Sequence, residues 1–372
     1  MNERDQAWLQ EVWGKLQTKM SAECERVGER IPYAPENGTY VEDKGETDLD
    51  WWTNGFWPGM LWQMYHATKD EKYRVAAEGV ERRLDAALDS FEGLHHDVGF
   101  MWLHTAVANY RLTGNAKSKT RGLHAANVLA ARYNPRGKFI RAWNQDRTGW
   151  MIIDCMMNIP LLYWATEVMG DPRFEFIARD HADTTLRLGL REDGSCNHIV
   201  SIDPNTGEFL EAPGGQGYES GSSWSRGQSW ALYGFALSYR YTKDERYLAA
   251  AKRVAHYFIA NAASSGDVPL VDFRAPAEPV LYDTTAGMIA ACGLLEIAEA
   301  VGEREKPLYA GAALRMLRAT EEKYCNWNVE EDAIVDGGTE AYHGRRNFPI
   351  IYGDYFFIEG VLRLRGQAFH IW

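Results

Sequence analysis

Apolar residues recur with the spacing of a helix over most of the chain. One predicted helix face has members at positions i, i+3, i+4, i+7 and i+11, namely Trp230, Tyr233, Gly234, Leu237 and Tyr241. Apolar runs of this kind are separated by short polar turns, and each turn precedes another run. The pattern therefore predicts a predominantly helical protein.

A similar polar turn recurs along the chain. Thr, Gly, Lys and Asp dominate the turns, and a Tyr, a Phe or a charged residue follows them. The turns are ATKDEKY (67–73), LTGNAKS (112–118), VMGDPRF (168–174), YTKDERY (241–247) and AVGEREKPLY (300–309). Their spacing of 45 to 73 residues predicts helical hairpins in series. Chance agreement among common turn residues is the alternative, because the period is irregular.

Polar and aromatic residues also mark the starts of six predicted helices. These segments are DLDWWTNGFW (48–57), HHDVGF (95–100), MIIDCMMN (151–158), SSWSRGQSW (222–230), LYDTTAGM (281–288) and YGDYFF (352–357). If six hairpins close into a ring with these helices innermost, the six N-termini meet at one mouth. The positive ends of the helix dipoles then favour an anionic ligand there. We therefore predict an all-α fold that forms one domain over residues 1–372.

The helical pattern lapses between residues 191 and 224. HIVSI and EFLEA are typical of two short strands, and DPNTG lies between them as a turn. The Gly- and Ser-rich segment PGGQGYESGSS then leads to the fourth inner helix. A long excursion at the mouth of a ring is a candidate substrate loop. The C-terminal segment DGGTEAYHGRRNFPIIYGDYFF is expected beside it on the same rim.

Composition and charge exclude several classes of protein. The formal net charge is -12 and no run of Lys and Arg is present, which argues against binding to nucleic acid or to a membrane surface. The five cysteines are odd in number and form no CxxC pair, so we expect reduced thiols. The N-terminal segment is charged and amphipathic and has no signal-like apolar stretch. We expect a cytoplasmic protein that is a monomer or a weak homo-oligomer.

Two acids stand in apolar surroundings just before predicted helices. Asp154 lies in GWMIIDCMMNIP, and Asp97 lies in GLHHDVGFMWLHTAV. One interpretation of Asp154 is a helix N-cap, since Asp is a preferred cap and Pro160 is tolerated near a helix start. The other is catalytic, because an acid held among apolar neighbours keeps its proton near neutral pH. The pair favours a catalytic site.

Aromatic residues make up 13% of the chain, including 14 Trp. Core packing must account for most of them, but several lie at the predicted helix starts or rim, namely Trp51, Trp52, Trp57, Trp143, Trp224 and Trp230. Trp beside Asp, Asn, Gln and His is typical of a sugar site. We expect the adjacent His95 and His96 to point in different directions, and no metal-binding spacing such as HExxH is present. Cys155 lacks an evident His partner for a nucleophilic role.

Five motifs resemble those of the unsaturated glucuronyl hydrolases of glycoside hydrolase family 88. They are DLDWWTNGFWPGMLW, GLHHDVGFMW, IIDCMMNIPLLYWA, SSWSRGQSWALYGFALSYRY and GDYFFIEGVLRL, in the same order from about Asp48 to the C-terminus. The resemblance implies an (α/α)6 barrel of six helical hairpins. It also implies removal of a 4,5-unsaturated uronic acid from the non-reducing end of oligosaccharides made by polysaccharide lyases. The resemblance further implies that no metal or organic cofactor is needed.

The resemblance also implies roles for individual residues. Asp154 is implied to be the general acid/base, and Asp97 the second essential acid, which holds hydroxyls of the sugar. Residues implied to bind substrate are Trp52, His96, Trp143, His198, Gln216, Trp224, Arg226 and Trp230, with Arg345 as a further candidate in the loop YHGRRNFP. Arg226, at a helix N-terminus, suits the C5 carboxylate of the sugar.

The substrate's chemistry makes one poised carboxyl sufficient. Protonation of the vinyl ether at C4 gives an oxocarbenium ion at C5, water traps the ion, and the resulting hemiketal loses the aglycone. An unsaturated galacturonyl or rhamnogalacturonyl hydrolase of the same fold stays open as an alternative. A carbohydrate-binding helical toroid without catalysis also stays open, although Asp97 and Asp154 argue against it. The sequence does not specify the parent polysaccharide, which could be hyaluronan, chondroitin, heparin or a plant or bacterial polymer.

Overall fold

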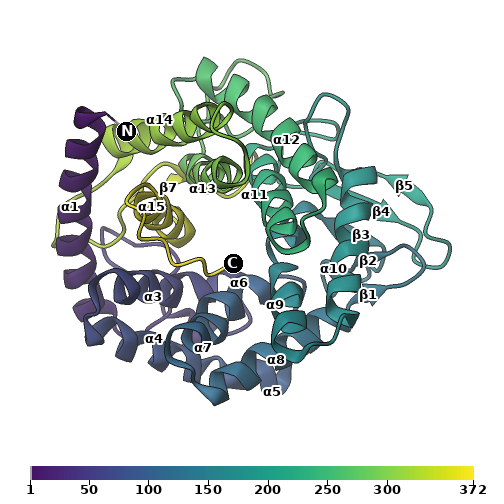
Figure 1. Ribbon diagram of the computed structural model, residues 1–372, viewed down its shortest axis with the longest axis horizontal. Helices are drawn as coiled ribbons and strands as arrows, with labels where there is room; N and C mark the ends of the chain where they lie inside the picture. Colours follow the sequence, from purple (N-terminus) through teal and green to yellow (C-terminus); the bar gives the residue numbers. More distant parts are fainter. Residues whose placement is uncertain (1) are drawn as a thin grey trace.

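Two concentric rings of helices make up most of the computed structural model, which describes residues 2–372 (Figure 1). Each inner helix contacts the next, and the last contacts the first, so the ring is closed. The inner ring consists of α3 (Phe56–Thr68), α6 (Val98–Trp102) with η2 (Leu103–Val107) and α7 (Ala108–Thr113), α9 (Pro160–Met169), α11 (Ser225–Thr242), α13 (Thr284–Ala300) and α15 (Ile351–Leu364). The predicted ring of inner helices is therefore confirmed.

The outer ring covers the inner ring with one helix for each hairpin. It consists of α1 (Glu3–Val27), α4 (Glu71–Arg83), α8 (Ala116–Ala130), α10 (Arg173–Thr184) with η4 (Thr185–Gly189), α12 (Glu245–Ser264) and α14 (Lys306–Tyr324). Five outer helices follow their inner partners in sequence. The sixth, α1, comes from the opposite end of the chain and contacts α15. The first and last long helices thus complete the sixth hairpin, and the (α/α)6 arrangement is confirmed.

The recurring polar turn joins inner helices to outer helices. Four inner helices end at a residue with left-handed backbone, namely Lys69, Gly114, Gly170 and Lys243. At all four of these turns the next residue is Asp or Asn, and its side chain accepts a backbone N–H in the first turn of the outer helix. The turn after α13 differs, since its last cap residue, Val301, is extended. The repeated motif is therefore a hairpin signal with a physical cause.

Short strands form three small sheets at the rim. The predicted hairpin is confirmed as β4 (Ile199–Ile202) and β5 (Phe209–Glu211), which pair in antiparallel fashion. The sequence did not predict β3 (Trp150–Ile152), which pairs with β4 on its other side. The remaining strands are β1 (Tyr133–Asn134), β2 (Phe139–Ile140), β6 (Gly338–Thr339) and β7 (Arg346–Phe348). Short helical segments are α2 (Lys44–Thr47), η1 (Trp52–Gly55), α5 (Asp85–Ser90) and η3 (Ile153–Met157).

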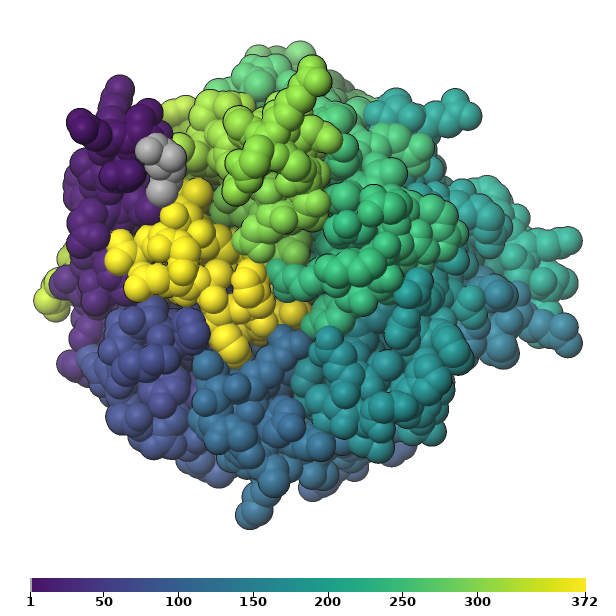
Figure 2. All heavy atoms as spheres, viewed as in Figure 1, coloured from purple at the N-terminus to yellow at the C-terminus, as the bar shows by residue number. Residues whose placement is uncertain are grey.

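The C-terminal residues close one end of the barrel. Figure 2 shows the last part of the chain, in yellow, in the middle of the face on view. Trp372 is 1% exposed, its ring is stacked 5.8 Å from that of Phe356, and its Nε1 donates to Glu359 Oε2 at 2.9 Å. None of the helices of residues 2–372 is long and apolar enough to cross a membrane. Because α15 runs toward this closed end, the N-terminal ends of the inner helices lie at the opposite end.

Candidate active site

A cavity of about 260 Å³ lies at the N-terminal ends of the inner helices. Its lining comes from the segments before α3, α6 and α9, from the start of α11 and from two rim loops. The lining residues are Trp51, Trp52, His95, His96, Asp97, Trp143, Ile152, Asp154, Gln216 and Arg226. The structure thus brings together seven of the residues predicted to form a site, and adds Trp51, His95 and Ile152.

Asp154 lies in η3, between β3 and α9. It does not cap a helix, because η3 and α9 have no side-chain cap and Pro160 begins α9 directly. The N-cap interpretation is therefore wrong. The side chain is 15% exposed, and within residues 2–372 its buried Oδ1 has no hydrogen-bond partner. Burial and then the negative charge of Asp97 raise the pKa of Asp154 to about 7.

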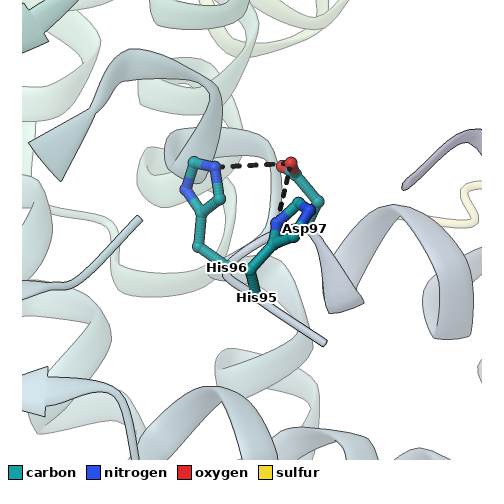
Figure 3. Close-up of side chains that lie close together, drawn as sticks. All are labelled: His95, His96 and Asp97. Carbon is teal, nitrogen blue, oxygen red and sulfur yellow. Dashed lines mark hydrogen bonds and ion pairs between the residues drawn. The ribbon is translucent and has the colours of Figure 1, made fainter. Parts of the chain in front are cut away.

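Asp97 occupies the N-cap position of α6, but its side chain does not cap that helix. Its Oδ1 accepts from Asn158 Nδ2 at 2.9 Å, and its Oδ2 lies 3.3 Å from His95 Nδ1 and 3.3 Å from His96 Nε2 (Figure 3). The expectation that the two histidines point in different directions is wrong, since both rings turn toward this oxygen. Burial raises the pKa of Asp97, but His96, His95 and Asn158 outweigh it and hold the pKa below its usual range.

The two acids therefore differ in protonation near neutral pH. Asp97 is surrounded by donors and is ionised, whereas Asp154 is buried beside a negative charge and keeps its proton up to about pH 7. Titratable groups whose surroundings drive their pKa values apart mark acid and base assignments. The cavity can consequently deliver a proton from Asp154 while Asp97 stays an acceptor of hydrogen bonds.

His198 lies beside Asp154 without lining the cavity. Its Nδ1 accepts from Gln216 N at 3.0 Å, so in the neutral ring Nε2 carries the proton. Burial and then Arg226 lower the pKa of His198 to about 3, which keeps the ring neutral. Nε2 lies 3.9 Å from Asp154 Oδ1, and the ring packs against Trp224 with centroids 4.3 Å apart. The Nε2–H group of His198 therefore lies near the Asp154 carboxyl.

Arg226 is held by three neighbours. Its Nη1 donates to Asp283 Oδ2 at 2.7 Å and to Thr339 O, and its Nη2 donates to Glu340 O at 2.6 Å. Gln216 Nε2 donates to the same Glu340 carbonyl at 2.7 Å. The guanidinium also lies over the Trp224 ring, 4.5 Å from its centroid. The rim loop that contains β6 therefore positions both Arg226 and Gln216 at the cavity.

Four residues predicted to bind substrate are not in the cavity lining, namely His198 and Trp224, which pack against each other, and Trp230 and Arg345. Trp230, one turn further along α11 than Arg226, is 0% exposed and packs against Phe100 at 5.1 Å between centroids. Arg345 is exposed and lies over the Phe348 ring at 3.8 Å. Trp230 is therefore part of the core beneath the site, and Arg345 is part of the rim.

The cluster of His95, His96 and Asp97 is the group at the cavity whose donor atoms could meet at a metal ion. One atom from each residue lies within 4.8 Å of the other two. However, the Asp97 carboxylate already accepts hydrogen bonds from Asn158 and His96. These bonds stabilise its negative charge. We interpret the cluster as a hydrogen-bonded support for Asp97.

The chain is similar to known proteins over nearly its whole length. The Glycosyl Hydrolase Family 88 description matches residues 24–245. The unsaturated glucuronyl hydrolase of Bacillus sp. (strain GL1) is 36% identical over 365 residues, which are 93% of this chain and 94% of that protein. The unsaturated chondroitin disaccharide hydrolase of Streptococcus pneumoniae is 34% identical over 339 residues, which are 84% of this chain and 81% of that protein.

A solved structure supports the same relationship. It is a UGL variant with an Asp-to-Asn substitution, described together with dGlcA-Glc-Rha-Glc. The two structures superpose with a TM-score of 0.91 at 34% identity, over 98% of each chain.

Proposed function

The chain belongs to glycosyl hydrolase family 88, and on this premise we propose that it is an unsaturated glucuronyl hydrolase. The enzyme removes a 4,5-unsaturated uronic acid from the non-reducing end of oligosaccharides that polysaccharide lyases release. The observation that carries this function is the pairing of a protonated Asp154 with an ionised Asp97 in one cavity. The relatives from Bacillus and Streptococcus, which share most of the chain, support it.

The cavity has the chemistry that a sugar ring requires. The faces of Trp52 and Trp143 offer apolar contacts to C–H groups, and polar side chains offer bonds to hydroxyls. Within residues 2–372, buried Trp51 Nε1, Asp154 Oδ1 and His198 Nε2 have no hydrogen-bond partner. Because buried polar atoms are nearly always paired, these three atoms are available to a bound sugar or to water.

In the proposed reaction, Asp154 donates its proton to C4 of the double bond, and an oxocarbenium ion forms at C5. The Asp154 carboxylate then takes a proton from the water that adds at C5. The hemiketal opens and the aglycone leaves. Asp97 accepts hydrogen bonds from ring hydroxyls and orients C4 toward Asp154. This route needs one proton donor and no carboxylate that attacks the anomeric carbon.

The uronate carboxylate is proposed to face Arg226. A guanidinium has five N–H donors, and three bonds go to Asp283, Thr339 and Glu340, so at most two donors remain for substrate. Asp283 balances the charge of Arg226, and the binding of an anion therefore depends also on the N-terminal ends of the inner helices. Arg226 is thus a directional donor in this scheme.

A panel of unsaturated disaccharides tests the function. We expect loss of the ultraviolet absorbance of the conjugated double bond with disaccharides from glucuronate-containing polymers, at much higher kcat/KM than with disaccharides from galacturonan or rhamnogalacturonan, which differ from them in linkage and aglycone. Faster turnover of the latter would transfer the function to that alternative. Binding without turnover of any member would favour the non-catalytic toroid. Comparing kcat/KM between sulfated and unsulfated members of the panel shows which aglycone the enzyme prefers.

The proposal extends to the organisation of the protein. We propose one catalytic domain over residues 1–372, which acts without a metal or organic cofactor as a monomer or weak homo-oligomer. The main hydrophobic cluster supports one domain, since it runs from Trp8 in α1 to Trp372. A cytoplasmic location is supported by the five cysteines, all of which are free thiols.

A further inference from the structure

The buried side-chain amide of Asn158 donates hydrogen bonds to both Asp97 and Asp154. Asn158 directly follows η3, is 0% exposed and does not line the cavity. Its Nδ2 donates to Asp97 Oδ1 at 2.9 Å and to the Asp154 carbonyl at 3.1 Å. Its Oδ1 accepts the Phe100 backbone N–H at 2.8 Å. Since a backbone N–H only donates, this bond fixes which end of the amide faces the acids.

The backbone around Asn158 is equally constrained. Phe100 lies in the first turn of α6, where the N–H has no partner in its own helix, so Asn158 supplies the missing acceptor. A Cβ on Gly99 would lie 2.5 Å from Asn158 Cα and 2.7 Å from its Oδ1. Glycine is therefore required at position 99 for α6 to approach η3 this closely. The motifs HHDVGF and IIDCMMN meet at this contact.

We propose that Asn158 is a positioning residue that fixes Asp97 relative to Asp154 and donates a hydrogen bond that favours the charged form of the Asp97 carboxyl. The inference rests on the proposed function for the roles of the two acids. The geometry carries it, because a single amide bonds to the side chain of one acid and the backbone of the other. No other side chain within residues 2–372 bonds to both Asp97 and Asp154.

The charged and titratable groups near Asp97 come from three segments. They are His95 and His96 beside it, Asp154 and Cys155 in η3, and Arg132 after α8. The substitution Asn158→Asp keeps the shape of the side chain and the oxygen that accepts the Phe100 N–H. It replaces the amide group that donates to Asp97 with a carboxyl oxygen. Like charges raise the pKa of neighbouring carboxyls, and the lost hydrogen bond to the charged form acts in the same direction.

The test compares pH profiles of kcat/KM for wild type, Asn158→Asp and Asn158→Ser. Serine has one O–H and cannot donate to both acids at once. We expect the acidic limb to move upward by about one pH unit in Asn158→Asp, with about a tenfold loss of kcat/KM on that limb. In Asn158→Ser we expect a smaller shift together with a lower kcat. If Asn158→Asp does not fold, Asn158→Ser alone decides.

Asn109→Asp is the matched control. Asn109 on α7 is 1% exposed, and its Nδ2 donates to Glu81 Oε2 at 2.7 Å, so it too is a buried amide that donates to a carboxylate. It is not part of the cavity lining. We expect this variant to lose thermal stability while the pH profile of the remaining activity stays that of wild type.

A second readout does not depend on turnover. Carboxyl resonances of [4-13C]aspartate, assigned with Asp97→Asn and Asp154→Asn, report the titration of the two acids directly. The inference is supported if Asn158→Asp moves the Asp97 titration upward and Asn109→Asp does not. It is overturned if the Asn158 variants only lower the melting temperature and leave the pH profile and the Asp97 titration unchanged. A wild-type protein without turnover would refute the proposed function, and the resonances would still decide the role of Asn158.

Discussion

Replacing Asp154 with Asn is predicted to abolish most activity and, at alkaline pH, to stabilise the fold. The asparagine cannot deliver a proton to C4, so we expect kcat/KM to fall by about 10² or more, the scale of general acid–base catalysis. The stability effect follows from the raised pKa of Asp154. Burial and the charge of Asp97 raise this pKa from 3.8 to about 7.

The magnitude and its direction come from proton linkage. Between about pH 4 and pH 7 the folded chain keeps the Asp154 proton that the unfolded chain loses, so this group's contribution to stability decreases as pH rises. Above about pH 7 the folded state contains a buried carboxylate, at a cost of ~4 kcal/mol for a difference of about 3 pH units. Below about pH 4 both states are protonated and the cost disappears.

Asparagine is never ionised, so the variant does not bear the cost of a buried carboxylate. It should therefore be more stable than wild type only at pH values where Asp154 is ionised in the folded wild-type protein. With an unfolding entropy of ~2.1 cal/mol/K per residue and 372 residues, ~4 kcal/mol corresponds to a rise in Tm of about 5 °C at pH 8. At pH 4 we expect nearly equal Tm values. Calorimetric scans of wild type and variant at both pH values measure the difference.

Asp89→Asn is the control for the pH series, because Asp89 is exposed on α5 and outside the cavity lining. Its Tm difference from wild type should be small at both pH values. The reasoning would be refuted if Asp154→Asn changed Tm equally at pH 4 and pH 8, or if it lowered Tm at pH 8. Near-normal turnover by the variant would separately remove Asp154 from the role of acid.

Three further predictions test the same scheme. Asp97→Asn should lose activity by about 10² or more and move the basic limb of the pH profile downward, because its charge raises the pKa of Asp154; an unchanged basic limb would contradict the coupling. Turnover in heavy water should place deuterium at C4 of the released sugar, and a saturated glucuronide should be inert; its cleavage at a comparable rate would restore ordinary glycoside hydrolysis. Trp372→Ala should destabilise the fold by about 3–5 kcal/mol, since the ring stacks on Phe356 and donates to Glu359; denaturant unfolding measures this loss, and a change below about 1 kcal/mol would exclude a structural role for this contact.

The sequence predicted the parts of the fold that depend on local interactions. Helical spacing and the polar turns were sufficient for the inner helices, because a left-handed cap residue and a following Asp or Asn cap are encoded within a few positions. The closure of the ring was not readable in this way. The contact between α1 and α15 joins the two ends of the chain. The sequence near an amphipathic helix does not specify which other helix it will pack against, so this contact could not be predicted.

The candidate site shows the same division. Asp97 and Asp154 are conspicuous because each is an acid in an apolar run. Trp230 belongs to a helix start by sequence, but its position one turn along α11 places it in the core. Asn158 was not identified, because an Asn near a helix start is ordinary and its partner Asp97 is 61 residues away. Gly99, two residues after Asp97, was a signal in the sequence. The reason for a glycine there becomes evident only in the structure, where Asn158 leaves no room for a Cβ at position 99.

The difference between the two acids arises from how their segments are held. Asp154 follows β3, and the backbone bond from Ile153 N to His198 O at 3.0 Å continues the pairing with β4, so the sheet places this carboxyl in the cavity without supplying donors to Oδ1. Asp97 precedes α6, where Asn158 and His96 direct donors at its carboxylate. Two residues of the same type thus acquire opposite protonation states, since one is surrounded by hydrogen-bond donors and the other is not. The negative charge held on Asp97 then helps to keep the proton on Asp154, so the group that binds sugar hydroxyls in the proposed reaction also prepares the acid that starts it.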